Sequence, residues 1–509
     1  MKDSRVASAQ GMLFRQRLYF FAFLAYLAVL PIANTVALRY LLLLVLLSLI
    51  AFELMRKKTL PAHSWRVLPL APGGLLLLWA AYLLLFPLWA EQPTVAWENL
   101  RGQWGTALVA WIIGIAGVLL LGRRGPNLWQ LGLASAFLVA IHLFIILLAW
   151  SGLLGAKVQV DMPLREMLSN LQSILSGSSP WALQAFPWGF RGFDPMHGNL
   201  GYTADQSIIL FMCCLLFAAL GRRFVVAGWA GLAVVICFMS VVIAYSRGAV
   251  LYGLVMILLA SAVFCLRFHW RTIDRQIASR PKGRRGQFVL MLVMLAALGL
   301  VAMFSFSKDE RWHQMSDKVR IAFMIKDPVR FLCEGPDKAT LDGMRARMAD
   351  REPDYVTALI GGLNGDGARI TLMRAGWLLV QEHPLGLDGS RLTYKKLIEE
   401  KCGHMPAMVY EHAHQGWLDT ALALGWVGCL SLLALLFGMA WYGWRHLRHP
   451  SAGPWALALF LLAVFWLLRG FADSIYREHL LQMQAALLGY ICARLTLELR
   501  PDVSANAAF

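Results

Sequence analysis

The feature of this sequence that most constrains its fold is a series of uncharged apolar blocks, each about 20 residues long. An α-helix of that length crosses the roughly 30 Å hydrocarbon layer of a bilayer. Apolar residues make up 59% of the chain and charged residues 15%, and no polar linkers divide the 509 residues into soluble domains. We therefore predict an all-α polytopic membrane protein, which excludes a soluble enzyme, a disordered chain and a secreted disulfide-rich scaffold.

The apolar blocks number about twelve, and an even number of spans puts both chain ends on one side of the membrane. The predicted spans cover residues 17–36, 38–54, 68–89, 105–121, 128–150, 205–220, 224–245, 249–266, 287–306, 416–440, 454–470 and 479–495. They divide the chain into three predicted parts: residues 1–306 with nine spans, residues 307–415 forming a large, mainly helical loop, and residues 416–509 with three spans and a tail.

The basic residues orient these spans. The segments on the side of the N-terminus hold 23 basic and 5 acidic residues, whereas the rest of the chain holds 24 and 25. Since an excess of Lys and Arg marks cytoplasmic loops, we predict that both termini are cytoplasmic and that the large loop is outside. The net charge of +17 then follows from topology, and nucleic acid is not an expected partner. A second apolar block follows the first at once, which is typical of a retained signal-anchor rather than a cleaved signal peptide.

Two loops on the predicted outer side are long enough to carry structure. Residues 151–204 contain aromatic residues beside Pro and Gly at 181–190, a combination typical of an interfacial helix in the headgroup layer. Residues 307–413 hold 16 basic and 16 acidic residues and show helical patterns at 337–350 and 369–382. We expect this larger segment to fold and to cap the membrane part.

The cysteines lead to two separate predictions. Six of the eight lie in or beside predicted spans, where they are expected to pack as small apolar residues. Cys333 and Cys402 both lie in the large outer loop, where disulfide bonds persist, and we predict a bond between them; two unrelated buried thiols are the alternative. No CxxC or Cys/His spacing typical of zinc is present, so no metal site is predicted.

Two arginines stand where charges are unfavourable. Residues 224–266 carry a single charge, Arg247, at a turn between two spans. It is either an anion-binding residue or a snorkelling arginine at the interface. Arg369 lies in the first turn of the predicted helix 369–382, where a bound anion would offset the unfavourable charge; a solvated arginine is the alternative.

His414 leads directly into the predicted span 416–440. On a continuous helix, Gly425 and Gly428 would lie within about 40° of its face. We therefore predict a stripe of small residues that lets a neighbouring helix pack closely, with His414 at its head. A neutral histidine at the membrane–water boundary can act as a general base; a histidine that is merely interfacial is the alternative.

Two further segments lie at the predicted outer boundary. The helix at 369–382 ends in a Pro/Gly break, Pro384-Leu385-Gly386-Leu387-Asp388-Gly389. Asp473 follows the end of the predicted span 454–470. It either orients a histidine or neutralises an arginine, or else it caps a helix.

These residues resemble a known family. His414-Gln415, nine residues and then Gly425-Trp426-Val427-Gly428 fit the pattern His-(Asn/Ser/Gln)-x9-Gly-x2-(Gly/Thr/Val) of bacterial O-antigen ligases. Their superfamily also contains O-antigen polymerases and some protein O-oligosaccharyltransferases. The predicted twelve spans, the large loop before the motif helix and the Ser246-Arg247-Gly248 turn are similar too. So is the stretch from Arg369 to Gly389, which looks like the family's arginine helix and Pro-x-Gly-x-Gly turn. The resemblance covers about residues 200–495.

The resemblance implies an enzyme that transfers a glycan from undecaprenyl diphosphate to a hydroxyl of lipid A–core oligosaccharide. The reaction would take place at the periplasmic face of the bacterial inner membrane, without metal or cofactor, with His414 as general base and with inversion as the simplest outcome. Guanidinium groups match phosphate oxygens, and the arginines predicted to bind the donor diphosphate are Arg247, Arg369 and Arg191. The residues predicted to support the site are Asp473, Gln415, Gly425 and Gly428.

Three other functions compete with this prediction. O-antigen polymerase is the alternative within the superfamily, because it uses the same lipid-linked donor and differs in acceptor. A twelve-helix secondary transporter would carry ionisable residues at mid-span, whereas the unusual charges here lie at the outer ends of predicted spans. A non-catalytic membrane scaffold would not need the two arginines and the histidine.

Overall fold

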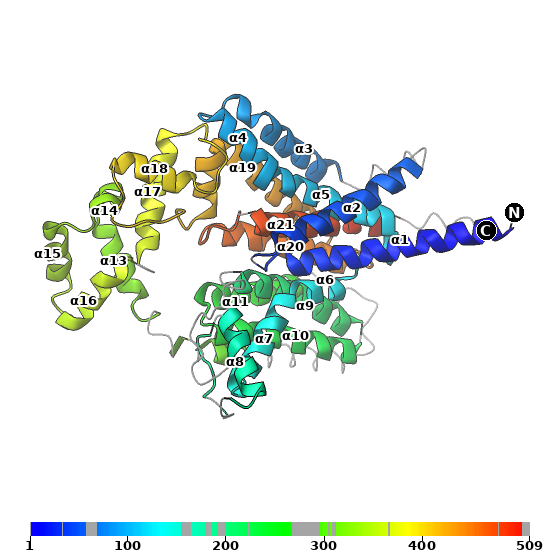
Figure 1. The fold of residues 1–509 in the computed structure, drawn as a ribbon, viewed down its shortest axis with the longest axis horizontal. Coiled ribbons are helices and arrows are strands. Elements are labelled where there is room, and N and C mark those ends of the chain that lie inside the picture. The colour runs from blue at the N-terminus through cyan, green and yellow to red at the C-terminus, as the bar shows by residue number, and fades with distance from the viewer. Residues whose placement is uncertain are drawn as a thin grey trace.

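The structure, a computed structural model, consists of helices and connecting segments, with no strand among the residues that it describes (Figure 1). It describes residues 2–500 apart from 33, 57–68, 154–163, 179–182, 184, 191–198, 222, 267–295, 297, 304–305, 308–311, 365–366 and 477. The predicted all-α fold class is confirmed for these residues.

The helices fall into three groups along the chain. The first group is α1 (Lys2–Val29), α2 (Val36–Arg56), α3 (Leu70–Leu85), α4 (Pro93–Asn99), α5 (Gly105–Leu121), α6 (Leu128–Ser135), α7 (Phe137–Trp150), α8 (Leu164–Leu175), α9 (Leu200–Leu220), α10 (Phe224–Ile243) and α11 (Arg247–Phe264). The second group is α13 (Met315–Met324), α14 (Pro328–Glu334), α15 (Lys338–Arg347), α16 (Pro353–Gly361), α17 (Ala368–Glu382) and α18 (Thr393–Cys402), called the helical subdomain below. The third group is α19 (Gly416–His446), α20 (Gly453–Arg469) and α21 (Glu478–Glu498).

Eight described segments are long and apolar enough to cross a membrane, and α6 with α7 makes a ninth if their 48° bend lies within one span. The eight are Val36–Arg56, Leu70–Leu88, Pro93–Arg124, Leu200–Leu220, Phe224–Ile243, Arg247–Phe264, Gly416–His446 and His479–Glu498. Helix α20 is apolar but has only 17 residues, and the predicted span 287–306 lies largely outside the described residues. The chain is therefore a multi-pass membrane protein, but the predicted number of twelve spans is not reproduced.

The helical subdomain projects from one end of the helix bundle, and α1 begins at the opposite end (Figure 1). We call the bundle end nearest the helical subdomain the subdomain end. Helices α15 and α17 form close to where the sequence predicts helices, at 337–350 and 369–382. The described part of the aromatic cluster, residues 183 and 185–190, is not helical and forms a turn at 188–189, whereas the amphipathic helix α8 lies earlier in this region.

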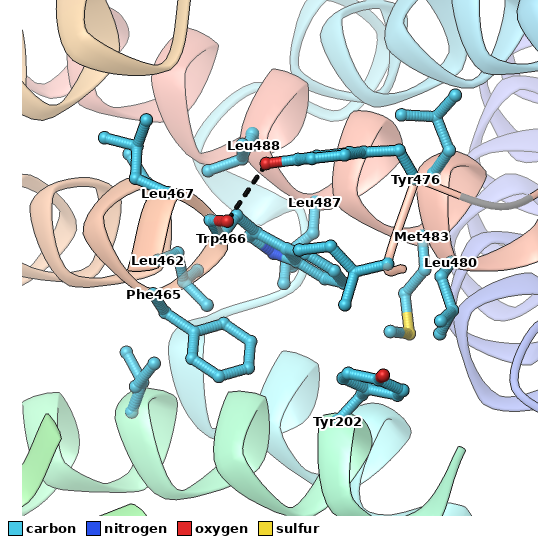
Figure 2. Packing of buried hydrophobic residues seen from close by; sticks show 14 of the residues in the cluster. Tyr202, Leu462, Phe465, Trp466, Leu467, Tyr476, Leu480, Met483, Leu487 and Leu488 are labelled. Atoms are coloured by element: carbon cyan, nitrogen blue, oxygen red, sulfur yellow. Dashed lines mark hydrogen bonds between the residues drawn. The ribbon is translucent and has the colours of Figure 1, made fainter. Parts of the chain in front are cut away.

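The centre of the bundle is built around α20, whose apolar surface is buried against α19, α9, α11 and α21. Figure 2 shows its Trp466 among Tyr476, Leu480 and Leu487, with the Tyr476 hydroxyl donating to the Trp466 carbonyl at 3.0 Å. Helices in lipid associate through close packing rather than through the hydrophobic effect. The contact of α5 with α21 illustrates this, since a Cβ at Gly114 would lie 2.2 Å from the Ala486 carbonyl oxygen.

Two connections join the first helices of the helical subdomain, α13 and α14, to its last helices, α17 and α18. Arg374 of α17 donates from Nη1 to the carbonyl oxygens of Ala322 (3.1 Å) and Ile325 (2.6 Å), which satisfies carbonyls that the end of α13 leaves unpaired. Cys333 and Cys402 form a disulfide bond between α14 and α18, with Cα atoms 5.2 Å apart. The helical subdomain is thus held covalently as well as by packing.

Candidate active site

A break in α19 organises the subdomain end of the bundle. Gly425 lies inside this helix with φ 75° and ψ 173°, which interrupts the helical hydrogen bonding. The residues before the break bond elsewhere: the carbonyl oxygen of Leu422 accepts from the Leu387 amide at 3.0 Å, and that of Ala423 accepts from the Gly389 amide at 2.9 Å. Backbone groups that a continuous helix would pair internally therefore bind the Pro/Gly segment that follows α17.

The fit between these two segments requires glycine on both sides. A Cβ at Gly386 (φ 82°) would lie 2.2 Å from the Gly425 amide nitrogen, and one at Gly425 would lie 2.5 Å from the Leu385 carbonyl oxygen. After the break, the Trp426 amide donates to the Pro384 carbonyl oxygen at 3.0 Å. Two glycines predicted from separate motifs thus meet at a backbone-to-backbone contact.

The predicted stripe of small residues beneath His414 is wrong. Helix α19 begins at Gly416 and is broken at Gly425, so His414 and the two glycines do not share the face of one continuous helix. Gly428 does allow a close approach, since a Cβ there would lie 2.6 Å from the Tyr82 ring of α3. Gly425 serves the break itself, which the 3.6-residue periodicity of a regular helix does not anticipate.

Asp388 is fully buried and stabilises the turn after α17. Its Oδ1 accepts from the Ser390 amide at 2.8 Å and from the Thr393 hydroxyl at 2.5 Å, and its Oδ2 accepts from Lys396 Nζ. Asn99 of α4 donates to its carbonyl oxygen at 2.9 Å. These bonds fix the turn against the membrane helices and against the start of α18.

His414 lies just before α19, in a left-handed conformation with φ 54°. Gln415 is the N-cap of the helix and accepts from the Leu418 amide. On either side of the histidine, the Ala413 amide donates to Asp419 Oδ1 at 2.8 Å and the Gly416 amide donates to the Gly470 carbonyl at 2.7 Å. The position of the imidazole is therefore imposed by bonds to its backbone neighbours, and such strain is typical of functional sites.

Asp473 faces this histidine from the segment between α20 and α21. Its Oδ1 lies 3.9 Å from His414 Nδ1, which is too long for a direct hydrogen bond. Its Oδ2 accepts from the Tyr202 hydroxyl at 2.5 Å, and its Oδ1 accepts from the Ser474 amide at 3.0 Å. Of the alternatives for Asp473, this geometry corresponds to a carboxylate beside a histidine.

Burial raises the pKa of the Asp473 carboxyl, but nearby donors and positive charges outweigh burial and hold that pKa well below its ordinary value. In order of effect, these neighbours are His414, Arg469, Tyr202 and Arg369. The carboxylate is consequently ionised at neutral pH. The carboxylate lies on the Nδ1 side of the imidazole.

Arg369 joins this group from α17. It is exposed, and its Nη1 lies 3.5 Å from the carbonyl oxygen of Ala472, the residue before Asp473. The structure therefore brings together three of the residues predicted from sequence, His414, Asp473 and Arg369, although they belong to three separate segments.

The two other predicted arginines have different outcomes. Arg247 is the first residue of α11 and half-buried. Its neighbours in the turn pack against Arg469, since a Cβ at Gly248 would lie 3.5 Å from Arg469 Nη1. Arg247 thus lies at the subdomain end, and its sharing of one ligand with Arg369 stays a prediction. Arg191 lies outside the described residues.

Sequence reasoning missed a buried ion pair beside the site. Arg469, the last residue of α20, places Nη1 3.4 Å from Oδ2 of Asp205, which is fully buried. Its guanidinium carbon lies 4.5 Å from the Tyr202 ring centroid and 4.8 Å from that of Tyr252. Asp205 was predicted to begin its span, whereas α9 begins five residues earlier at Leu200 and encloses it. A charged residue within an apolar segment was the signal that could have identified the pair.

Asp419 was missed as well. It lies in the first turn of α19, where its Oδ2 accepts from the Ser474 hydroxyl while its Oδ1 holds the Ala413 amide. One carboxylate thereby ties together the segments that carry His414 and Asp473. Among the described residues, no three His, Cys, Asp or Glu side chains come together as a metal-binding group.

Comparison with known proteins adds one finding. Residues 208–433 match a protein-family model described as O-Antigen ligase. The match includes Arg247, Arg369 and His414, and also Gly386 and Gly425, which meet at the helix break. Asp473 and Arg469 lie beyond it. No curated protein matches the chain.

Proposed function

Because residues 208–433 match the O-Antigen ligase family model, we propose that the chain is an O-antigen ligase of the O-antigen ligase and polymerase superfamily. In this proposal it transfers a glycan from undecaprenyl diphosphate to a hydroxyl of lipid A–core oligosaccharide. The transfer takes place at the subdomain end of the bundle, which is the periplasmic side of a bacterial inner membrane in this proposal. The observation that carries it is the convergence of His414, Asp473 and Arg369 at the subdomain end of the bundle.

His414 is the general base. The acceptor hydroxyl oxygen attacks the anomeric carbon of the donor sugar, and its proton passes to Nε2 of His414. A new glycosidic bond forms as the bond between that carbon and the diphosphate oxygen breaks, so undecaprenyl diphosphate leaves with the electron pair. Asp473 orients the imidazole and stabilises the imidazolium, in the manner of a carboxylate behind a catalytic histidine. A single displacement of this kind inverts the anomeric configuration.

Arg369 and Arg247 bind the diphosphate of the donor. The diphosphate gains negative charge as it leaves, and guanidinium groups positioned for two parallel hydrogen bonds stabilise that charge. Arg191 is the third member of the proposed set. Lysine keeps the charge but loses the planar, two-pronged geometry, so Arg→Lys at either described position should retain a small fraction of the activity that Arg→Ala removes.

The shared diphosphate site has its own test. Purified variants of Arg247 and Arg369 are compared for binding of the lipid-linked donor and for transfer. We expect Arg→Ala at each position to weaken donor binding, and the double variant to be no worse than the worse single variant, because the two residues act together. If Arg369→Ala keeps wild-type donor affinity while Arg247→Ala loses it, the two residues do not share a diphosphate site and Arg369 is a surface charge.

O-antigen polymerase is the second candidate, since the family match covers both enzymes. The two share a donor and differ in acceptor, so a deletion strain separates them on a lipopolysaccharide gel. Uncapped lipid A–core with polymer retained on the carrier supports the ligase. Core capped by single repeat units supports the polymerase and overturns our proposal.

A further inference from the structure

A cleft of about 850 Å³ lies within the helical subdomain, separate from the His414 site. The end of α13, the turn that follows it, and parts of α14 and α15 form its walls. The volume is within the about 300–1,000 Å³ typical of ligand sites. Nothing in the proposed mechanism uses this cleft.

Every carboxylate that lines the cleft is already engaged by this chain. Asp327 caps α14 by accepting from the Arg330 amide at 3.0 Å, and Asp337 caps α15 by accepting from the Thr340 amide at 2.6 Å. Glu334 accepts from Arg330 Nε at 2.9 Å. These bonds hold the three carboxylates in place against their own helices, and their charges remain part of the lining.

Three cations that line the same cleft, Arg320, Lys326 and Arg347, form no ion pair with the residues that the structure describes. All three are exposed and come from different elements. With Arg330, the lining holds four cations and three carboxylates, and the three cations without an ion pair are free to make charge-assisted hydrogen bonds to an anionic ligand.

The cleft also offers an aromatic surface. Phe323 of α13 is 64% exposed, although an apolar ring of this size is usually covered. Arg374 holds its guanidinium 5.9 Å from the ring centroid. An exposed aromatic face can pack against the C–H face of a sugar ring, while the surrounding cations pair with acidic substituents.

We propose that this cleft binds the anionic sugar residues of a glycan substrate, which carry phosphate or carboxylate groups. The identification of this glycan as part of the acceptor or the donor rests on the proposed function. The cleft is coupled to the site through α14. The Leu332 and Cys333 carbonyls of this helix accept from the amides of Met408 (3.1 Å) and Ala407 (2.9 Å), a few residues before His414. A glycan held here is positioned relative to the general base.

Binding is measured on the full-length protein in nanodiscs by isothermal titration calorimetry. The probes are core oligosaccharide released from lipopolysaccharide by mild acid, the same material after removal of phosphate, O-antigen polysaccharide, and neutral dextran. We expect a phosphorylated or carboxylated glycan to bind at least about tenfold more tightly than its neutral counterpart, since charge-assisted hydrogen bonds are about twice as strong as neutral ones. Binding of core alone assigns the cleft to the acceptor, and binding of polysaccharide alone assigns it to the donor.

The variant Arg320→Ala/Lys326→Ala/Arg347→Ala should lose at least about tenfold in affinity for the anionic probe. The matched control, Arg345→Ala/Lys395→Ala/Lys401→Ala, removes the same charge from two exposed positions and one half-buried position that do not line the cleft, and it should stay within about twofold. Thermal unfolding checks that each variant folds. Phe323→Ala, which leaves the charge unchanged, should weaken binding of anionic and neutral glycan alike.

Equal affinities for charged and neutral probes, or equal losses in the cleft variant and its control, overturn the proposal. Transfer kinetics give a separate readout: the cleft variant should raise KM for the glycan and leave kcat unchanged. A protein that binds anionic glycan through these residues but shows no ligation refutes the proposed function and not the cleft. Normal ligation with no glycan binding at the cleft refutes the cleft alone.

Discussion

The His414 site and the cleft of the helical subdomain both lie at the subdomain end, but they satisfy their polar groups in different ways. Around His414, backbone groups and half-buried carboxylates are paired across four segments far apart in the sequence. Around the cleft, pairing is local, within one or two turns of helix, and three cations remain exposed. The first arrangement suits a fixed catalytic geometry, whereas the second suits recognition of a charged ligand in water.

The largest expected effect is on the chemistry at His414. His414→Ala should leave the protein inserted and folded but lower transfer by about 10²–10⁴-fold, the usual contribution of a general base. His404→Ala, at an exposed histidine in the same loop, is the control and should retain activity. Transfer in vitro with purified protein measures both, and near-normal transfer by His414→Ala would refute its role as base.

A comparison of two ion pairs sharpens the contrast between a buried and an exposed setting. Asp205→Asn leaves Arg469 buried without the carboxylate that lies 3.4 Å from its Nη1 and should destabilise the protein by about 3–5 kcal/mol. Asp342→Asn, which breaks the exposed pair with Arg345, should cost less than about 1 kcal/mol. Thermal unfolding in detergent measures both, and similar losses would contradict the difference. The double variant Asp205→Asn/Arg469→Met should recover part of the lost stability.

The helix break tests the backbone contact at the site. Gly425→Ala combines a left-handed φ with a Cβ 2.5 Å from the Leu385 carbonyl, so we expect a loss of about 2–4 kcal/mol and of transfer activity. Gly343→Ala in α15 has open space around the added methyl group and should be neutral or slightly stabilising. Unfolding midpoints of the two variants measure the difference in stability. Equal midpoints would show that the contact between Gly425 and the segment after α17 tolerates a side chain.

Removal of the disulfide should affect the helical subdomain first. Cys333→Ser/Cys402→Ser frees a long loop, and we expect the helical subdomain to lose about 2–4 kcal/mol. Hydrogen exchange followed by mass spectrometry should show faster exchange in α14 and α18 and unchanged exchange in α20. Uniform protection throughout would mean that packing and Arg374 suffice to hold the helical subdomain.

The smallest expected effect concerns pH. The folded-state pKa of Asp473 lies below its unfolded value, so this carboxylate stabilises the protein above the ordinary carboxyl pKa, and that contribution is lost as pH falls through the folded value. Asp473→Asn should therefore be less stable than wild type at pH 7, by about 1–2 kcal/mol, and the two should converge in acid. A difference independent of pH would refute the electrostatic role of Asp473.

Sequence patterns determined much of this protein because they report local physics. Apolar blocks long enough for a bilayer identify the membrane helices, and period-3.6 patterns identify α15 and α17, since both depend on residues close in the chain. The motif around His414 and Gly425 predicted the family whose model residues 208–433 match. The number of spans stays a prediction, because α6 and α7 are bent, α20 is short and the predicted span 287–306 lies largely outside the described residues.

Only the tertiary structure decided how these segments combine. That Gly425 breaks α19, and that the freed carbonyls bind the segment after α17, depends on a backbone-to-backbone contact that no helical period encodes. The pairing of Arg469 with Asp205, and the tie that Asp419 makes between the segments of His414 and Asp473, join residues 55 to 264 positions apart. Long-range pairs of this kind form because a polar group buried among apolar helices must find a partner, and the choice of partner depends on which helices pack together.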